Sequence, residues 1–77
     1  MKELLLYLAH KLVENPDAVR VEEEQQEDGT RLVLHVAPDD MGKVIGRQGR
    51  IAKSIRTLVR SCAPRGCGKV IVDIEEA

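Results

Sequence analysis

Aromatic residues are almost absent from this chain of 77 residues, which has no tryptophan or phenylalanine and a single tyrosine, Tyr7. This scarcity argues against ligand recognition by stacked aromatic platforms, as in RRM sheets and many single-strand-binding OB-folds. A nucleic-acid site on this chain would therefore need an aliphatic floor.

Long apolar runs are also missing. None reaches the roughly 20 residues that span a bilayer. The longest run, residues 4–9, is followed by His10 and Lys11 and lacks a cleavage-site pattern. We expect a cytoplasmic protein with no membrane partner, formed by a single domain over residues 1–77. The hydrophobic core of so small a domain contributes only about a few kcal/mol of net stability. Dimerisation would bury further surface and add to that stability.

Cysteine is scarce, and Cys62 and Cys67 stand five positions apart. Zinc would need two further ligands, and His10 and His35 lie far away in a pattern that is not typical of ligands. A disulfide across so short a loop is disfavoured in a cytosolic protein. We expect ordinary cysteines at a helix end and in a loop, with no metal and no cofactor.

Acidic residues are absent from one long segment. Residues 43–69 contain eight Lys and Arg residues and carry +8, whereas the whole chain carries −1 and the remainder therefore −9. Concentrated positive potential attracts polyanions and makes their binding sensitive to salt. The basic residues are Lys43, Arg47, Arg50, Lys53, Arg56, Arg60, Arg65 and Lys69.

Within this basic segment, residues 44–51 read Val-Ile-Gly-Arg-Gln-Gly-Arg-Ile. Gly46 can end a helix in a left-handed conformation that a Cβ would resist. Gly49 can allow a close backbone approach where the next helix begins, and amide groups near Gly49 and Arg50 at that helix start would attract anions. Two glycines that merely connect two helices are the alternative interpretation.

The side chains around the two glycines suit a polyanion. Arg47, Gln48 and Arg50 supply donors at the rim, while Lys43 and Lys53 extend the positive track. Ile45 and Ile51 would form an aliphatic floor under bases, although a purely core role explains them equally well.

The apolar periodicity predicts six elements. A helix over 2–14, stopped by Asn15-Pro16-Asp17, is followed by strands over 18–25 and 30–36 with an Asp28-Gly29 turn between them. A short helix from 38 to 45, with an aspartate as N-cap, precedes a helix over 50–62 and a strand over 69–75.

The faces of the two longer helices can be predicted from their spacing. The first should bury Met1, Leu4, Leu5, Leu8 and Leu12, leaving a second apolar strip of Leu6, Ala9 and Val13 under a loop or against a partner. The later helix should bury Ile51, Ile55, Leu58 and Cys62, with Ala52 and Val59 at the border. Lys53, Arg56 and Arg60 then face outward, toward solvent or RNA.

This order of elements, with the loop Gly46-Arg47-Gln48-Gly49, resembles a KH domain of the type II, or prokaryotic, fold over the whole chain. The fold expected is α+β, with helices packed on one face of a three-stranded sheet. The run from Asp40 to Arg50, followed by Ile-Arg-Thr-Leu-Val at 55–59, is similar to the small stand-alone bacterial KH proteins of the KhpA family.

The resemblance implies a protein that binds single-stranded RNA and serves as a post-transcriptional regulator or RNA chaperone linked to cell growth, shape and division. It also implies a homodimer, or a heterodimer with a second KH protein, KhpB. The GXXG motif carries over to Gly46, Arg47, Gln48 and Gly49. The expected RNA-binding residues are Lys43, Ile45, Gly46, Arg47, Gln48, Gly49, Arg50 and Lys53.

An enzyme is not expected. The glycines fit neither the Walker A nor the Rossmann spacing, and no nucleophile–base set or small-molecule substrate site is suggested. The alternative function is a protein-interaction module whose fold mainly mediates dimerisation. Leu58 and Val59, where apolar residues approach the basic face of the helix, are the predicted dimer contacts.

Overall fold

The computed structural model describes residues 1–66 and 68–77. The predicted order α-β-β-α-α-β is confirmed. The helices are α1 (Lys2–Leu12), α2 (Met41–Ile45) and α3 (Arg50–Ser61), and the strands are β1 (Arg20–Gln26), β2 (Gly29–Val36) and β3 (Lys69–Glu76). Since α3, with 12 residues, is the longest helix described, no helix in this part of the chain could cross a membrane.

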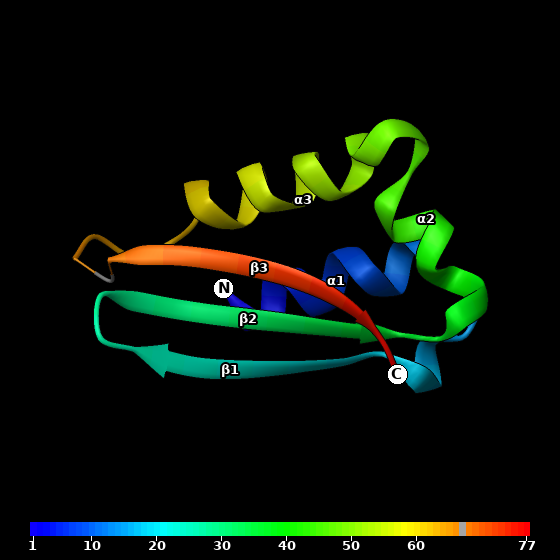
Figure 1. The fold of residues 1–77 in the computed structure, drawn as a ribbon, viewed down its shortest axis with the longest axis horizontal. Helices are drawn as coiled ribbons and strands as arrows, with labels where there is room; N and C mark the ends of the chain where they lie inside the picture. The colour runs from blue at the N-terminus through cyan, green and yellow to red at the C-terminus, as the bar shows by residue number, and fades with distance from the viewer. Residues whose placement is uncertain (67) are drawn as a thin grey trace.

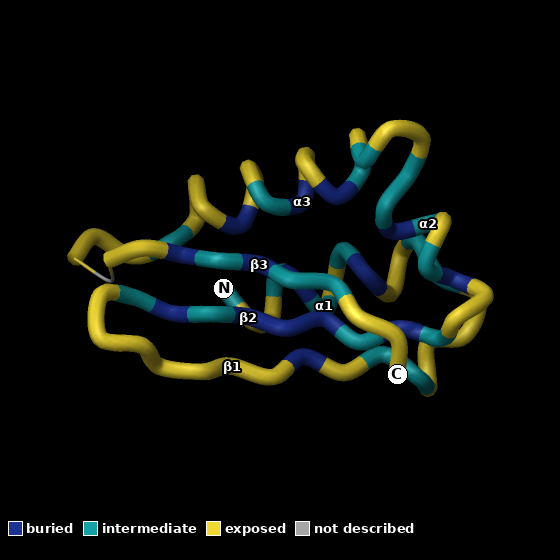
Figure 2. Tube along the Cα trace, in the orientation of Figure 1, coloured by how far each residue is buried: buried dark blue, intermediate teal, exposed yellow. Residues whose placement is uncertain are grey.

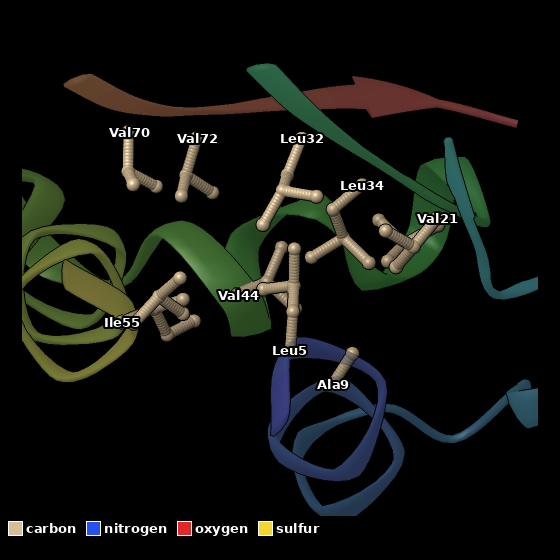
Figure 3. Packing of buried hydrophobic residues seen from close by; sticks show 11 residues of the cluster. Leu5, Ala9, Val21, Leu32, Leu34, Val44, Ile55, Val70 and Val72 are labelled. Carbon is tan, nitrogen blue, oxygen red and sulfur yellow. The ribbon is translucent and has the colours of Figure 1, made fainter. Parts of the chain in front are cut away.

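The strands form one mixed sheet in the order β1-β2-β3 (Figure 1). β1 pairs antiparallel with β2 through a hairpin, and β2 pairs in parallel with β3. A parallel pair requires the chain to cross over one face of the sheet, and α2 and α3 make that crossover. α1 packs on the same face as this crossover, so the three helices cover one face of the sheet and leave the other open (Figure 3).

The core lies between this sheet face and the helices (Figures 2 and 3). On β2, Leu32, Leu34 and Val36 alternate along the strand and are all fully buried on its inner face. The other residues of the buried cluster come from every element except the loops: Leu5, Ala9, Val21, Val44, Ile55, Val59, Val70 and Val72.

The first strand starts later than predicted. A 3-10 turn, Pro16–Ala18, follows α1, and β1 begins only at Arg20. Proline fixes φ near the helical value and favours the first turn of a helix, so Pro16 initiates this turn rather than only ending α1. The strand is exposed along almost its whole length, with Val21 as its one buried side chain (Figure 2).

The predicted Asp28-Gly29 turn is wrong by one residue. Gln26 pairs with Gly29, so Glu27 and Asp28 are the loop residues and Gly29 already belongs to β2. A Cβ on Gly29 would collide with the backbone of Lys69 in β3. The glycine thus permits the close approach of β3, a tertiary contact that a turn pattern cannot predict.

The buried face of α3 is rotated from the predicted one. Ala52, Ile55 and Val59 are buried, whereas Leu58 is 48% exposed and Cys62 is exposed. Apolar residues occupy a wide arc of this helix, so its spacing alone did not determine which edge of the arc faces the sheet. The expectation about Cys67 lies outside the described residues.

In α1, one core accounts for both predicted apolar strips. Leu5 from the first strip and Ala9 from the second are fully buried. Their neighbours Leu4, Leu6, Leu8, Leu12 and Val13 are partly buried against the same cluster. The second strip is therefore part of the packing between α1 and the sheet.

The predicted aspartate N-cap of α2 is correct in position, but its side chain does not cap the helix. Asp40 stands at the N-cap position, but its carboxylate makes no hydrogen bond to the start of α2. Instead Asp40 is fully buried, and its two oxygens accept from the backbone N–H groups of Glu14 and Asn15 at 3.1 and 3.0 Å. The side-chain amide of Asn15 donates a third bond at 3.1 Å. Asp40 thus joins the chain after α1 to the start of the crossover.

These contacts set the charge state of Asp40. Burial by itself raises the pKa of the carboxyl. The hydrogen bonds from residues 14 and 15 and the nearby Lys43 ammonium lower the pKa by more than burial raises it, so it lies below its ordinary value of 3.8. A carboxyl with a depressed pKa in the folded state contributes stability above its ordinary pKa. That contribution is lost as the pH falls below 3.8 and through the lower pKa of the folded state.

We predict that Asp40→Asn lowers the midpoint of thermal unfolding by several degrees at neutral pH, because one acceptor oxygen becomes an NH2 group facing backbone donors. The deficit should shrink as the pH falls below the ordinary carboxyl pKa. Asp39→Asn, an equal charge change at an exposed neighbour, is the control for thermal melts followed by circular dichroism. An equal deficit in both variants, or one independent of pH, would contradict this role.

Candidate nucleic-acid interface

The loop Gly46–Gly49 joins α2 to α3 at one end of the molecule, where the chain bends sharply (Figure 1). Gly46 ends α2, and its N–H donates to the carbonyl of Gly42 at 2.9 Å. Its φ of 75° and ψ of 175° lie in a region open essentially to glycine alone. The prediction of a positive φ here is correct, although the conformation is the extended one rather than the left-handed helical one.

Gly46 is also held by packing. A Cβ at this position would lie 2.6 Å from Cγ1 of Ile51. The side chain of Ile51, from the first turn of α3, therefore fills the space beneath the loop. Only a residue without a Cβ fits between the two helices at this position.

The second half of the loop is left-handed at two successive residues. Gln48 has φ 58° and ψ 24°, and Gly49 has φ 74° and ψ 14°. Unlike Gly46, Gly49 faces open space, because no atom lies within 4 Å of where a Cβ would stand. Arg47 and Gln48 are exposed at the tip of this bend.

The expected anion donors need correction. The N–H of Gly49 donates to the carbonyl of Gly46 at 3.2 Å, and the N–H of Arg50 donates to the carbonyl of Arg47. Both amides are thus used within the loop. Among the described residues, no backbone carbonyl accepts from the amides of Arg47 and Gln48, so these two are the donors left at the tip.

A groove of about 360 Å³ lies beside the loop, between the start of α3 and the second half of β3. Its aliphatic lining comes from Ile45, Ala52 and Ile74. Ile45 was predicted to form such a floor, but Ile51 was not found there because it packs under Gly46. Ala52 and Ile74 were missed, since only the tertiary fold places β3 opposite the loop.

Charged side chains of both signs line the same groove: Arg31, Arg56, Asp73 and Glu75. The guanidinium of Arg31 donates to Asp73 at 2.7 Å, lies 3.8 Å from Glu75 and pairs with Glu24 at 2.9 Å. These bonds, that to Asp73 foremost, raise the pKa of Arg31. One wall of the groove is therefore polar and partly self-neutralised, which the alternating pattern of β3 did not indicate.

The basic residues predicted to flank the loop lie in two separate regions of the structure. Arg50 and Lys53 are exposed on the first turn of α3, next to the loop. Lys43 instead pairs with Glu14 at 2.9 Å and with Asp40 at 3.7 Å. The hydrogen bond to Glu14, followed by the two carboxylate charges, raises the pKa of the Lys43 ammonium despite its partial burial. Lys43 therefore belongs mainly to the junction between α1 and α2.

Arg56 and Arg60 were expected to face either solvent or RNA. The Nε of Arg56 donates to the carbonyl of Val72 at 3.0 Å, and the Nε of Arg60 donates to that of Val70 at 3.2 Å. β3 is an edge strand, so these outward carbonyls have no strand partner. The two arginines thus satisfy the free edge of the sheet, a role that neither expectation contained.

The remaining residues singled out in the sequence, Leu58, Val59 and Cys62, differ in their exposure. Val59 is fully buried in the core and has no surface to offer a partner, which corrects its assignment as a dimer contact. Leu58 is 48% exposed beside a shallow hollow formed with Arg50, Lys53, Ser54 and Thr57. Cys62 is a free, exposed thiol, and within the described residues no group of three or more His, Cys, Asp or Glu side chains could hold a metal ion.

A family model described as KhpA/KhpB, KH domain, matches residues 2–74 of this chain. The chain belongs to the KhpA/KhpB KH-domain family. Three relatives, each named RNA-binding protein KhpA, illustrate the likeness. Those of Clostridium acetobutylicum and Caldanaerobacter subterraneus are 51% and 53% identical over 74 residues, covering 96% of this chain and 99% of the relative. That of Streptomyces coelicolor is 41% identical over 75 residues, covering 97% and 95%.

Membership agrees with the architecture. Three helices and a three-stranded mixed sheet in the order α-β-β-α-α-β are consistent with the predicted type II KH fold. The named relatives are binding proteins rather than enzymes, in agreement with the expectation for this chain. The loop Gly46–Gly49, which reads Gly-Arg-Gln-Gly, lies within the matched residues.

We predict that the two loop glycines differ in their tolerance of a side chain. Gly46→Ala should cost about 2–4 kcal/mol, through its positive φ and the collision with Ile51. Gly49→Ala should cost only about 1–2 kcal/mol, because the left-handed conformation is strained but the space is open. Urea unfolding of each variant measures these costs.

Gly42→Ala is the matched control. Gly42 lies in α2 at an ordinary φ, with nothing within 4 Å of a Cβ, so the substitution should stabilise the protein by about 0.5–1 kcal/mol. Equal costs at positions 46 and 49 would contradict the packing described for Ile51.

Proposed function

We propose that this KH domain, spanning residues 1–77, binds single-stranded RNA in the cytoplasm through the GXXG loop and the adjoining groove. The observation that carries the proposal is the loop tip, where the side chains of Arg47 and Gln48 are exposed and their amides have no backbone acceptor. The next loop residue, Gly49, lines a groove with both aliphatic and charged side chains. The names of the relatives, RNA-binding protein KhpA, support the same ligand. No cofactor is part of the proposal.

The loop would hold the sugar–phosphate backbone. The amides of Arg47 and Gln48 donate to a phosphate, and the Arg47 guanidinium adds a charge-assisted bond. The open side of Gly49 lets the strand approach the backbone of the protein. Arg50 and Lys53 continue the positive track along the outer face of α3.

The groove would receive the bases of about four nucleotides, the number that a KH loop clamps. Ile45, Ala52 and Ile74 offer aliphatic surface to the base faces. Arg56 and Asp73 border the same groove, where they can hydrogen-bond to base edges. With no aromatic side chain to stack on the bases, affinity depends strongly on phosphate contacts and falls as salt rises.

A post-transcriptional role follows from this proposal together with the family resemblance. A protein with modest affinity for unpaired RNA suits a regulator or RNA chaperone, and its family suggests a link to cell growth, shape and division. Dimerisation with a second copy or with a KhpB-type KH protein would join two such sites and raise avidity without new contacts.

We predict that Arg47→Asp with Gln48→Asp weakens binding of fluorescent single-stranded RNA by more than about tenfold, since one charge-assisted contact contributes about 1.5–3 kcal/mol. Titrations at two salt concentrations should show weaker binding of the unmodified protein at the higher one. Arg20→Asp with Gln26→Asp is the control, because it changes the net charge equally on exposed positions of β1. If the loop variant binds like the control variant, the loop is not the clamp.

A protein-interaction module is the second candidate function, favoured by one observation. Leu58 is a large apolar side chain, 48% exposed on α3. We propose that it contacts a partner KH domain. Arg50 and Lys53 border the same hollow and would repel each other between two copies, so self-association through this face should strengthen with salt, opposite to RNA binding.

We predict that Leu58→Ser shifts the protein toward monomer in sedimentation velocity while leaving its unfolding midpoint nearly unchanged, because the side chain is half exposed. Tyr7→Ser is the control, since within residues 1–66 and 68–77 Tyr7 is the other large exposed apolar residue, at 59%. A Leu58→Ser protein that associates like the unmodified chain would exclude this contact. If the unmodified protein associates but binds no RNA at low salt, the interaction module becomes the leading function.

A further inference from the structure

Two arginines on α3 are held in place along the open edge of β3. Arg56 and Arg60 lie one helical turn apart, and their Nε groups donate to the carbonyls of Val72 and Val70. Each bond uses one of the five N–H donors of a guanidinium. Among the described residues, no carboxylate lies within ion-pair distance of either arginine. Their outer donors are therefore available at fixed positions.

α3 lies alongside β3, and the line along which they meet is called the α3–β3 seam (Figure 1). Each of the two arginines lines a different hollow along this seam. Arg56 lines the groove beside the GXXG loop. Arg60 lines a second hollow of about 550 Å³, formed with Lys69, Pro64 and Ile71 where α3 ends and β3 begins. From Ile74 to Val70 the strand advances about 13 Å, which is more than a single nucleotide spans.

In the part of the chain that the structure describes, the hollow at Arg60 and Lys69 is lined by basic but by no acidic side chains. Arg60, Arg65 and Lys69 are exposed, and Asp28 of the hairpin, whose backbone carbonyl accepts from the N–H of Lys69 at 2.9 Å, is the acidic residue next to this end of the seam. Because the backbone carbonyls fix the guanidiniums, less side-chain entropy is lost when they bind an anion. A polyanion leaving the loop groove along β3 would therefore meet successive donors one nucleotide step apart.

We propose that the α3–β3 seam is a second RNA-contact region, in which Arg56 and Arg60 guide the strand from the loop groove to a phosphate subsite at Arg60 and Lys69. This deepens the proposed function and rests on it. The protein then binds a longer single strand than the about four nucleotides of the loop groove, and its affinity increases with strand length. The subsite recognises phosphate, without reading the base.

The test measures binding of fluorescein-labelled random-sequence RNA pools of about four and about ten nucleotides. The unmodified protein should bind the longer pool more tightly. In Arg60→Gln with Lys69→Gln, the short pool should bind as before. The longer pool should then bind more tightly than the short one only because a longer strand offers more starting positions for the loop groove. The salt dependence for the longer pool should decrease by about 0.7 in log–log slope for each phosphate that the variant no longer neutralises.

Two further variants distinguish loss of the phosphate subsite from misfolding and from a general effect of charge. Lys69→Gln alone removes half of the subsite without touching the Arg60–Val70 bond, so it should show part of the effect even if the double variant folds poorly. Lys2→Gln with Arg20→Gln matches the double variant in charge at exposed positions away from the seam and should keep the full length gain.

The seam proposal is overturned if the Arg60 and Lys69 variants keep the length gain of the unmodified protein, or lose affinity equally for both pools. Failure of the proposed function looks different. In that case neither pool binds the unmodified protein, or Arg47→Asp with Gln48→Asp leaves the short pool bound.

Discussion

The parallel pairing of β2 with β3 is the constraint from which the candidate interface follows. A strand can return parallel to its neighbour only if the chain crosses one face of the sheet, and here that crossing consists of α2, the glycine loop and α3. It brings the loop to the same end of the molecule as the carboxyl end of β3 (Figure 1). Ile45 and Gly49 thereby line one groove with Asp73 and Ile74, more than twenty residues away in sequence.

The same topology leaves β3 at the edge of the sheet, and side chains from the crossover cover that edge. Edge strands expose unpaired carbonyls that invite pairing with other chains. Arg56 and Arg60 reach down from α3 and satisfy two of them. Basic side chains follow one another along α3, while a run of acidic ones lies on β1 and in the hairpin after it: Glu22, Glu23, Glu24, Glu27 and Asp28. A net charge of −1 conceals this separation.

The elements and their order could be predicted because each has a strong local signal. Runs of Val, Leu and Ile mark β2 and β3, and Gly46 marks the end of α2 through a conformation that other residues resist. Helix faces were harder to predict. The apolar residues of α3 cover a wide arc, and only contact with the sheet selects Val59 over Leu58 for burial.

Sequence by itself determined the fold class, the position of the loop and the basic character of the segment around it, since these depend on local conformation and on charge counts. Tertiary structure alone decided which charges are available. It turned Asp40 toward the end of α1, paired Lys43 with Glu14, and tied Arg31 to Asp73. These partners are brought together by packing between elements remote in the chain, and hydrophobic periodicity carries no information about which polar side chains will meet across them.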